Sequence, residues 1–136
     1  MLYQIDVDYG LENEILCKSK IEQFFNQKLN KLDYYNDFDF TNNNNNLLIE
    51  LKSRRCKIND YSDTMISISK INKAKKLIKN KDKKIEIYFF FYYLKNELYY
   101  WKYDDTIDLR IDDNCFYRNV RKKYAYIDTK LLTKIN

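Results

Sequence analysis

The chain has 136 residues, of which 45% are hydrophobic and 17% aromatic, and its formal net charge is +5. This size favours one domain over residues 1–136 with one core, and the composition excludes a disordered chain. The sequence has no histidine and one glycine. These absences exclude His-dependent hydrolases, His-ligated zinc catalysts and glycine-rich nucleotide loops, so we expect no nucleotide cofactor. A catalyst here has to use carboxylates, lysine, tyrosine or a bound metal.

We expect a protein without a membrane segment, located in a reducing compartment. No uncharged apolar run is long enough to span a bilayer, and the N-terminus lacks the pattern of a signal peptide. Cys17, Cys56 and Cys115 are odd in number and far apart, which does not suit a disulfide framework. The expected location is therefore the cytoplasm or nucleus, including that of a virus-infected host.

The first half of the chain predicts a helix followed by a strand hairpin. Tyr3–Tyr9 alternates loosely and predicts a short strand or loop, and Leu11–Leu32 shows helical spacing of apolar residues. Asp33–Phe40 and Leu47–Arg54 are predicted strands, joined by a turn at the five asparagines Asn42–Asn46.

The second half predicts a loop, a basic helix and further strands. Cys56–Asp63 is the loop, Thr64–Asn80 the helix, Ile85–Leu94 a buried central strand and Glu97–Tyr103 its hairpin partner. The remaining predicted elements are short strands at 106–111 and 124–127 and a short helix at 129–135. This order predicts an α/β fold in which a central mixed sheet is flanked by helices.

The strand after the asparagine run has one apolar and one charged face. Side chains alternate along a strand, so one face carries Leu47, Ile49 and Leu51. The other face carries Leu48, Glu50, Lys52 and Arg54. Charged residues are rarely placed where a face could be buried, which singles out this strand as a candidate site.

The asparagine turn sets the register of the hairpin. A turn centred between the third and fourth asparagine places Asp39 opposite Glu50 and Asp37 opposite Lys52. Opposed Cβ atoms lie about 4.5–5.5 Å apart, close enough for two carboxylates to share one cation. Asp37 is otherwise an ordinary charge at the strand edge, and both interpretations of it stay open.

The residues opposed in this way predict a magnesium site. Two adjacent carboxylates repel each other, and Mg²⁺, with Mn²⁺ as a substitute, prefers oxygen ligands and keeps several waters. We expect Asp39, Glu50 and the carbonyl of Leu51 as ligands, and Lys52 orienting the nucleophilic water or stabilising charge on a phosphate. The alternative is a cross-strand ladder of salt bridges on a solvated face.

The pattern Asp39…Glu50-Leu51-Lys52 resembles the PD-(D/E)XK nuclease superfamily, which has the restriction-endonuclease-like and resolvase-like fold. The resemblance covers about residues 10–103 and is similar to small nucleases of phages and large DNA viruses. It is strengthened by the residues that follow the motif: Ser53-Arg54, Tyr61, Thr64-Met65-Ile66 and Lys70. The sequence departs from the pattern in one respect, because no proline precedes Asp39.

This resemblance implies a Mg²⁺-dependent DNA endonuclease that hydrolyses phosphodiester bonds and works as a homodimer. It also implies a further acid from the first helix. Glu14 is preferred, Glu22 is the alternative, and Glu12 is a solvated N-terminal charge. The alternative function is a catalytically inactive protein of the same fold that binds nucleic acid or another protein.

Three basic residues are candidates for DNA binding. Arg54, Lys70 and Lys73 could contact phosphate oxygens, and the lysine run from Lys73 to Lys84 would attract DNA regardless of sequence. The alternative for Lys70 and for the lysine run is a solvated basic surface. The aromatic residues around Tyr88–Tyr93 and Tyr99–Trp101 could stack on bases, although strand spacing favours a core or dimer role.

Overall fold

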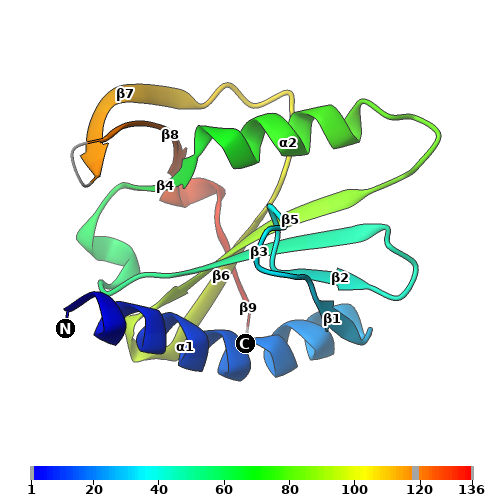
Figure 1. Ribbon diagram of the computed structural model, residues 1–136, viewed down its shortest axis with the longest axis horizontal. Coiled ribbons are helices and arrows are strands. Elements are labelled where there is room, and N and C mark those ends of the chain that lie inside the picture. The colour runs from blue at the N-terminus through cyan, green and yellow to red at the C-terminus, as the bar shows by residue number, and fades with distance from the viewer. Residues whose placement is uncertain (1, 118–119, 136) are drawn as a thin grey trace.

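The computed structural model describes the backbone of residues 2–117 and 120–135, and the side chains of residues 10–112 and 122–135. A six-stranded mixed sheet forms the centre, with strands in the order β1-β2-β3-β5-β6-β9. Helix α1 (Leu2–Phe25) covers one face. Helix α2 (Ile68–Ile78) and a second sheet, ordered β4-β8-β7, lie on the other face (Figure 1).

The strands of the central sheet are β1 (Leu29–Lys31), β2 (Phe40–Asn42), β3 (Leu47–Ser53), β5 (Glu86–Tyr93), β6 (Glu97–Lys102) and β9 (Thr133–Ile135). Those of the second sheet are β4 (Asp63–Ser67), β7 (Arg110–Tyr117) and β8 (Val120–Asp128). Short 3-10 helices occur at Ile58–Asp60, Leu94–Asn96 and Thr129–Leu131. Neither α-helix, over the residues described, is long and apolar enough to cross a bilayer.

The alternating side chains of β5 supply both cores. Phe89 and Phe91 face α2 and the second sheet, whereas Phe90 faces α1, and all three are fully buried. The parallel neighbour β3 runs in register with β5 from Leu47–Glu86 to Ser53–Tyr92. The aromatic run is therefore core, as its strand spacing predicts.

The predicted fold class is confirmed: the chain is an α/β protein with a restriction-endonuclease-like core of helix, strand hairpin, helix and strands. The predicted central strands at Ile85–Leu94 and Glu97–Tyr103 match β5 and β6 closely. The chain turns between these strands at Lys95 and Asn96, which both have positive φ.

Several element boundaries were wrong in the first half of the chain. Residues 3–9 belong to α1, which ends at Phe25 because Asn26 adopts a left-handed conformation with φ 51°. The chain then forms β1 within the range predicted as helix. Residues 33–39 are a loop, since the side chains of Asp33 and Asn36 bind nearby backbone N–H groups of Tyr35 and Phe38 in place of a ladder.

Other boundaries were wrong in the second half. Asp63–Ser67 is strand β4 and not helix, because it pairs with β8 from about sixty residues further along. The strand predicted at 106–111 starts at Arg110, and the one predicted at 124–127 lies inside β8. Thr133–Ile135, predicted as helix, pairs with β6 at the edge of the central sheet.

Candidate active site

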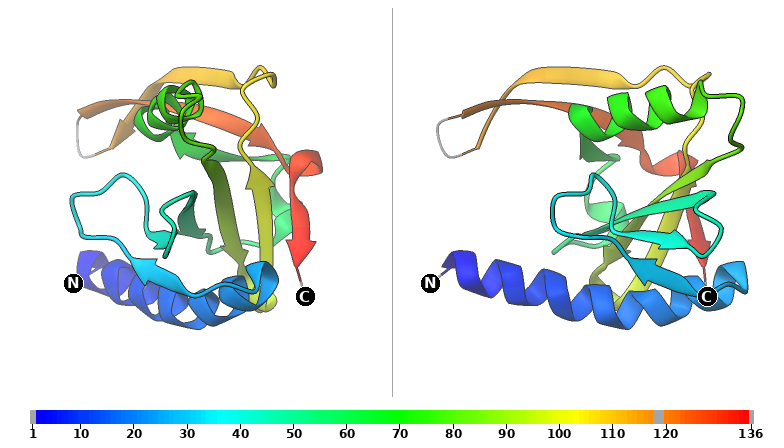
Figure 2. Two further views of the ribbon diagram at one scale, coloured as in Figure 1. Left: turned by 90° about the vertical axis from the view of Figure 1, so that its right-hand side faces the viewer. Right: turned by 45° about the vertical axis from the view of Figure 1, so that its right-hand side comes forward.

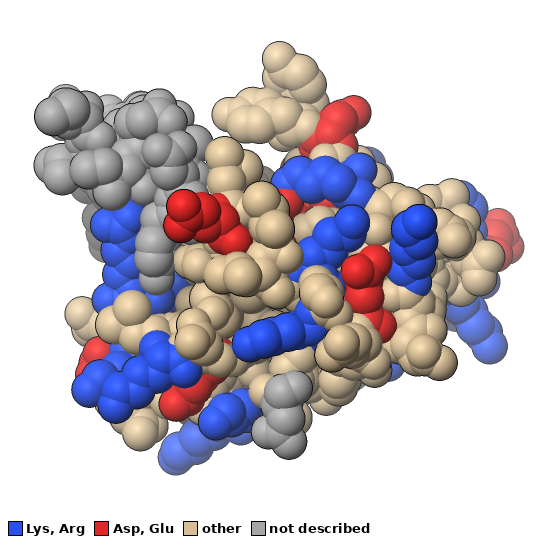
Figure 3. Space-filling model, turned by 90° about the horizontal axis from the view of Figure 1, so that it is seen from below, with Lys and Arg blue, Asp and Glu red and all other residues tan. Residues whose placement is uncertain are grey.

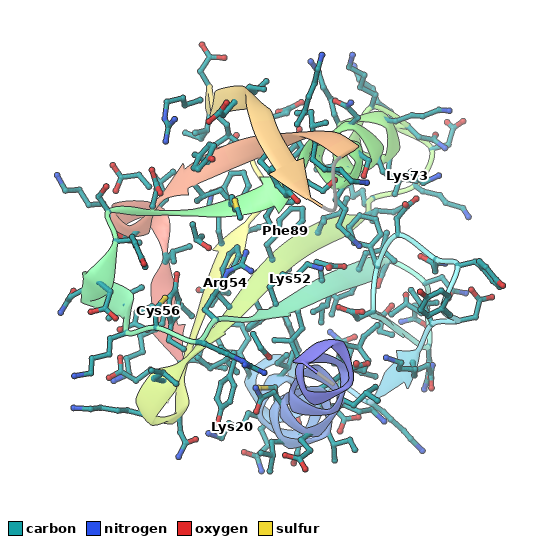
Figure 4. All side chains as sticks on the ribbon, turned by 60° about the vertical axis from the view of Figure 1, so that its left-hand side comes forward. Lys20, Lys52, Arg54, Cys56, Lys73 and Phe89 are labelled. Carbon is teal, nitrogen blue, oxygen red and sulfur yellow. The ribbon has the colours of Figure 1, made fainter. Side chains whose placement is uncertain are left out.

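The two faces of β3 are divided as the alternation predicts. Leu47 and Ile49 are buried in the core beneath α1. Glu50, Lys52 and Arg54 point to the opposite side, toward the layer of α2 and β4, where Lys52 and Arg54 are labelled in Figure 4. The charged face thus lies between the sheet and the second layer.

Asp39 is held beside Glu50 in the predicted register. Phe40 pairs with Ile49 and Thr41 with Leu48, which is the offset that the sequence predicts for Asp39 and Glu50. Two backbone hydrogen bonds hold Asp39 at the end of the loop: Asp39 N donates to Ile49 O and Asp39 O accepts from Leu32 N, both at 2.8 Å. Asp39 Oδ2 also accepts from Leu51 N at 2.8 Å, which fixes the carboxylate against β3.

Glu50 is a buried carboxylate between two lysines. Its side chain is 2% exposed. Oε1 lies 3.2 Å from Lys52 Nζ, and Oε2 lies 3.0 Å from Lys70 Nζ. An unpaired buried carboxylate is strongly unfavourable, so these two ammonium groups are what makes the burial of Glu50 tolerable.

Burial dominates the titration of Glu50. Burial raises the pKa of this carboxyl above its ordinary value of 4.5. Among the nearby charges, Lys52 lowers this pKa, Asp39 raises it and Lys70 lowers it. The effect of Asp39 means that the two acids sense each other electrostatically. A cation bound between them would favour the charged form of both.

Lys70, a candidate for DNA binding, lies within the site. It lies in the first turn of α2, and its Nζ contacts both Glu50 Oε2 and the backbone carbonyl of Asp37, the latter at 2.5 Å. The helical periodicity of the sequence could not reveal this contact, because the predicted helix began four residues too early, at Thr64. Asp37 therefore takes part through its backbone carbonyl.

The other two candidates for DNA binding occupy different environments. Arg54 is packed inside the protein: Nε donates to Thr64 Oγ1 at 3.0 Å and Nη2 to Met65 O at 2.5 Å. It thereby ties β3 to β4 and lines a separate cavity of about 310 Å³ with Cys56 and Tyr93. Lys73 is exposed on α2 and remains a candidate for phosphate contact (Figure 4).

The acids of the first helix make contacts at the other side of the sheet. Glu14 forms an ion pair with Lys31 of β1. Glu22 accepts a hydrogen bond from Leu29 N at 2.8 Å and so stabilises the turn that ends α1. Asn13 was not singled out from the sequence, yet it is buried and donates to Ser53 Oγ at the end of β3.

The donor set fits a magnesium ion. Within the described ranges, no group of three or more His, Cys, Asp or Glu side chains could hold a metal. The site instead offers two carboxylates, from Asp39 and Glu50, with the Leu51 carbonyl as a predicted third donor. Mg²⁺ is often bound by one or two carboxylates together with waters and substrate phosphate oxygens, so this set suffices.

The fold and the Asp–Glu–Lys arrangement define a protein of the PD-(D/E)XK class. The family model described as "Phage putative PDDEXK endonuclease" matches residues 3–112. The chain therefore belongs to this phage family of PD-(D/E)XK proteins. No curated protein and no solved structure matches it significantly.

Proposed function

We propose that the chain is a Mg²⁺-dependent DNA endonuclease that hydrolyses phosphodiester bonds at Asp39, Glu50 and Lys52. The observation that carries this proposal is the buried carboxylate of Glu50 next to Asp39, with Lys52 Nζ 3.2 Å away. The fold does not require a charged group at this buried position. Membership of the phage endonuclease family supports the same activity.

The residues of the site would have separate roles. Asp39 and Glu50 would hold the cation, with the carbonyl of Leu51, and the cation when bound would acidify water and polarise the phosphate. Lys52 is 40% exposed, so its ammonium group can reach a solvent-side phosphate, orient the attacking water and stabilise developing charge. Lys70 would keep the Glu50 carboxylate oriented toward Asp39.

DNA is the proposed partner and Lys73 a proposed phosphate contact. The opposite side of the molecule is a less suitable surface: Figure 3 shows Lys and Arg dispersed over the α1 face with acidic side chains between them. We also propose a homodimer, because cutting both strands of a duplex needs two sites. The proposed location is a reducing intracellular compartment. Glu14 would assist in the site only if it left its ion pair with Lys31.

The proposal is tested by incubating supercoiled plasmid, linear duplex, a four-way junction and single-stranded DNA with the protein and Mg²⁺ or Mn²⁺. We expect cleavage of at least one substrate by wild type, loss of cleavage with EDTA, and loss in Glu50→Ala and Glu50→Gln. Glu86→Gln is the matched control, since Glu86 is an exposed acid of β5 that pairs with Lys102 away from the site. Cleavage retained in Glu50→Gln, or absent in wild type, would contradict the proposal.

Metal binding is measured separately by calorimetric titration with Mn²⁺. We expect binding by wild type and Glu86→Gln, and greatly weakened binding by Glu50→Gln. This measurement also separates the alternative function: an inactive DNA-binding protein of the same fold would bind DNA without binding Mn²⁺ between Asp39 and Glu50.

A further inference from the structure

Two adjacent tyrosines protrude from the loop that leads to Asp39 of the candidate active site. Tyr34 is 91% exposed and Tyr35 is 93% exposed. Their rings contact each other edge to face, with centroids 5.5 Å apart at an interplanar angle of 86°. Tyrosine normally buries much of its ring, so two nearly bare rings side by side are not explained by the packing of the core.

The loop between β1 and β2 holds these rings away from the protein. Asp33 accepts hydrogen bonds from Tyr35 N at its side chain and from Asn36 N at its backbone carbonyl, both at 3.1 Å. The side chain of Asn36 accepts from Phe38 N at 3.1 Å. Phe38 is buried in the core and anchors the end of the loop. The turn is therefore ordered by its own polar groups, and the rings point outward as a consequence.

The same loop builds one wall of the site. Asp37, whose carbonyl contacts Lys70, follows Tyr35 by two residues, and Asp39 follows it by four. The loop projects from the sheet on the side toward the second layer, as Figure 2 shows for the segment that precedes β2. The two tyrosines thus precede Asp39, at which we expect the scissile phosphate to bind, by only five and four residues.

We infer that Tyr34 and Tyr35 form a stacking platform for unpaired nucleobases of the DNA next to the scissile phosphate. This inference rests on the proposed function. Every base has a π-face, and base–aromatic stacking tolerates any sequence. In a duplex those faces are already stacked, whereas single strands, flaps and junctions expose them. The substrate class selected is therefore DNA with unpaired nucleotides at the cleavage position.

The chemistry around the rings favours DNA over a second copy of the chain. The chain has a net charge of +5, so it attracts a polyanion such as DNA. Lys52 and Lys70 both pair with Glu50, and Lys70 Nζ also contacts the carbonyl of Asp37 in the tyrosine loop. DNA supplies both a base for the rings and a phosphate for these ammonium groups. An uncharged protein surface supplies no anion for the ammonium groups.

Fluorescence anisotropy of a labelled oligonucleotide tests the inference, with Ca²⁺ in place of Mg²⁺ so that binding is measured without cleavage. Tyr34→Ala/Tyr35→Ala is expected to bind single-stranded oligothymidine at least about tenfold more weakly than wild type, since stacking of each base contributes about five- to 150-fold. Binding to a blunt duplex is expected to change less than about twofold. Tyr34→Phe/Tyr35→Phe should bind like wild type, because the rings are kept.

Tyr61→Ala is the matched control, because Tyr61 is also an exposed tyrosine, 66% exposed, but lies in the cavity lined by Arg54. It should bind single strands like wild type. Equal single-strand binding by the double alanine variant and wild type would overturn the inference, as would a phenylalanine variant as weak as the alanine one. A change in sedimentation without a change in single-strand affinity would identify a surface between copies and would overturn it too. Failure of wild type to bind or cut any DNA would overturn the proposed function itself.

Discussion

On one face of β3, Ile49 packs against Cys17 and Ile21 of α1, whereas on the other face Glu50 lies between two lysines, next to Asp39. Both faces are buried at these positions, so burial alone does not distinguish them. The apolar face gains free energy from burial, whereas on the charged face two ammonium groups offset the loss of solvent around Glu50. One strand thus carries stability on one side and chemistry on the other.

The largest expected effect comes from the charged face. Lys52→Ala should lower the rate of DNA cleavage by about 100- to 1,000-fold, the usual cost of removing one group that stabilises transition-state charge. Its free energy of unfolding should also fall, because buried Glu50 loses one of its two ammonium partners, but the variant should stay folded because Lys70 remains. Single-turnover cleavage and urea denaturation measure the two quantities. A Lys52→Ala variant that unfolds at low urea but cuts DNA normally would show that the charged face serves stability and not chemistry.

The converse substitution acts on the apolar face. Ile49→Ala should lower the free energy of unfolding by about 2–5 kcal/mol, because it leaves a cavity against α1. The folded fraction should still bind Mn²⁺ with near wild-type affinity, since Ile49 points away from Glu50. Chemical denaturation and calorimetric titration check both expectations. Loss of Mn²⁺ binding in a folded Ile49→Ala protein would show that the two faces are not independent.

Lys70 and Lys73 of α2 test whether the effect on cleavage is limited to lysines that contact Glu50. Lys70→Ala should slow cleavage about tenfold or more, because it removes a charge-assisted hydrogen bond to Glu50. Lys73→Ala should change the rate less than about twofold and act mainly on the salt dependence of DNA binding. The pair is compared by cleavage at two salt concentrations. If the two variants lose the same activity, Lys70 has no special role in positioning Glu50.

The smallest expected effect is on the pH dependence of stability. Glu50 has a raised pKa in the folded protein, so the native state binds this proton more tightly than the unfolded state does. Its contribution to stability is full below about pH 4.5, the unfolded value, and is lost as the pH rises through the higher folded value. In EDTA, the stability of wild type relative to Glu50→Gln should fall with increasing pH. A difference that rises with pH would contradict the buried environment of Glu50.

Much of β3 and its hairpin was predictable because the information is local. Alternation assigns Ile49 and Glu50 to opposite faces, and a turn centred in the asparagine run gives the observed pairing of Phe40 with Ile49. Both depend only on neighbouring residues and on the period of a strand. The class of the fold followed from the order of such local patterns.

The features that sequence analysis missed depend on distant partners or on competing local bonds. Met65 and Ile66 fit a helical pattern as well as a strand, and only the pairing with β8 makes them β4. Lys70 reaches Glu50 because α2 begins after that strand. The exposed Tyr34 and Tyr35 fell in a predicted strand, since the turn formed by the Asp33 side chain is not visible in an aromatic pattern.

The asparagine run differs between its ends, which hydrogen bonds hold, and its middle, which is exposed. Asn42 is buried and its Oδ1 accepts from Asn46 N and Leu47 N, whereas Asn43, Asn44 and Asn45 are exposed. On its other edge β3 is held by a long parallel pairing with β5. Extra asparagines in the middle of the run would therefore lengthen the exposed part of the loop without sliding β3, and the spacing of Asp39 and Glu50 in space would be preserved.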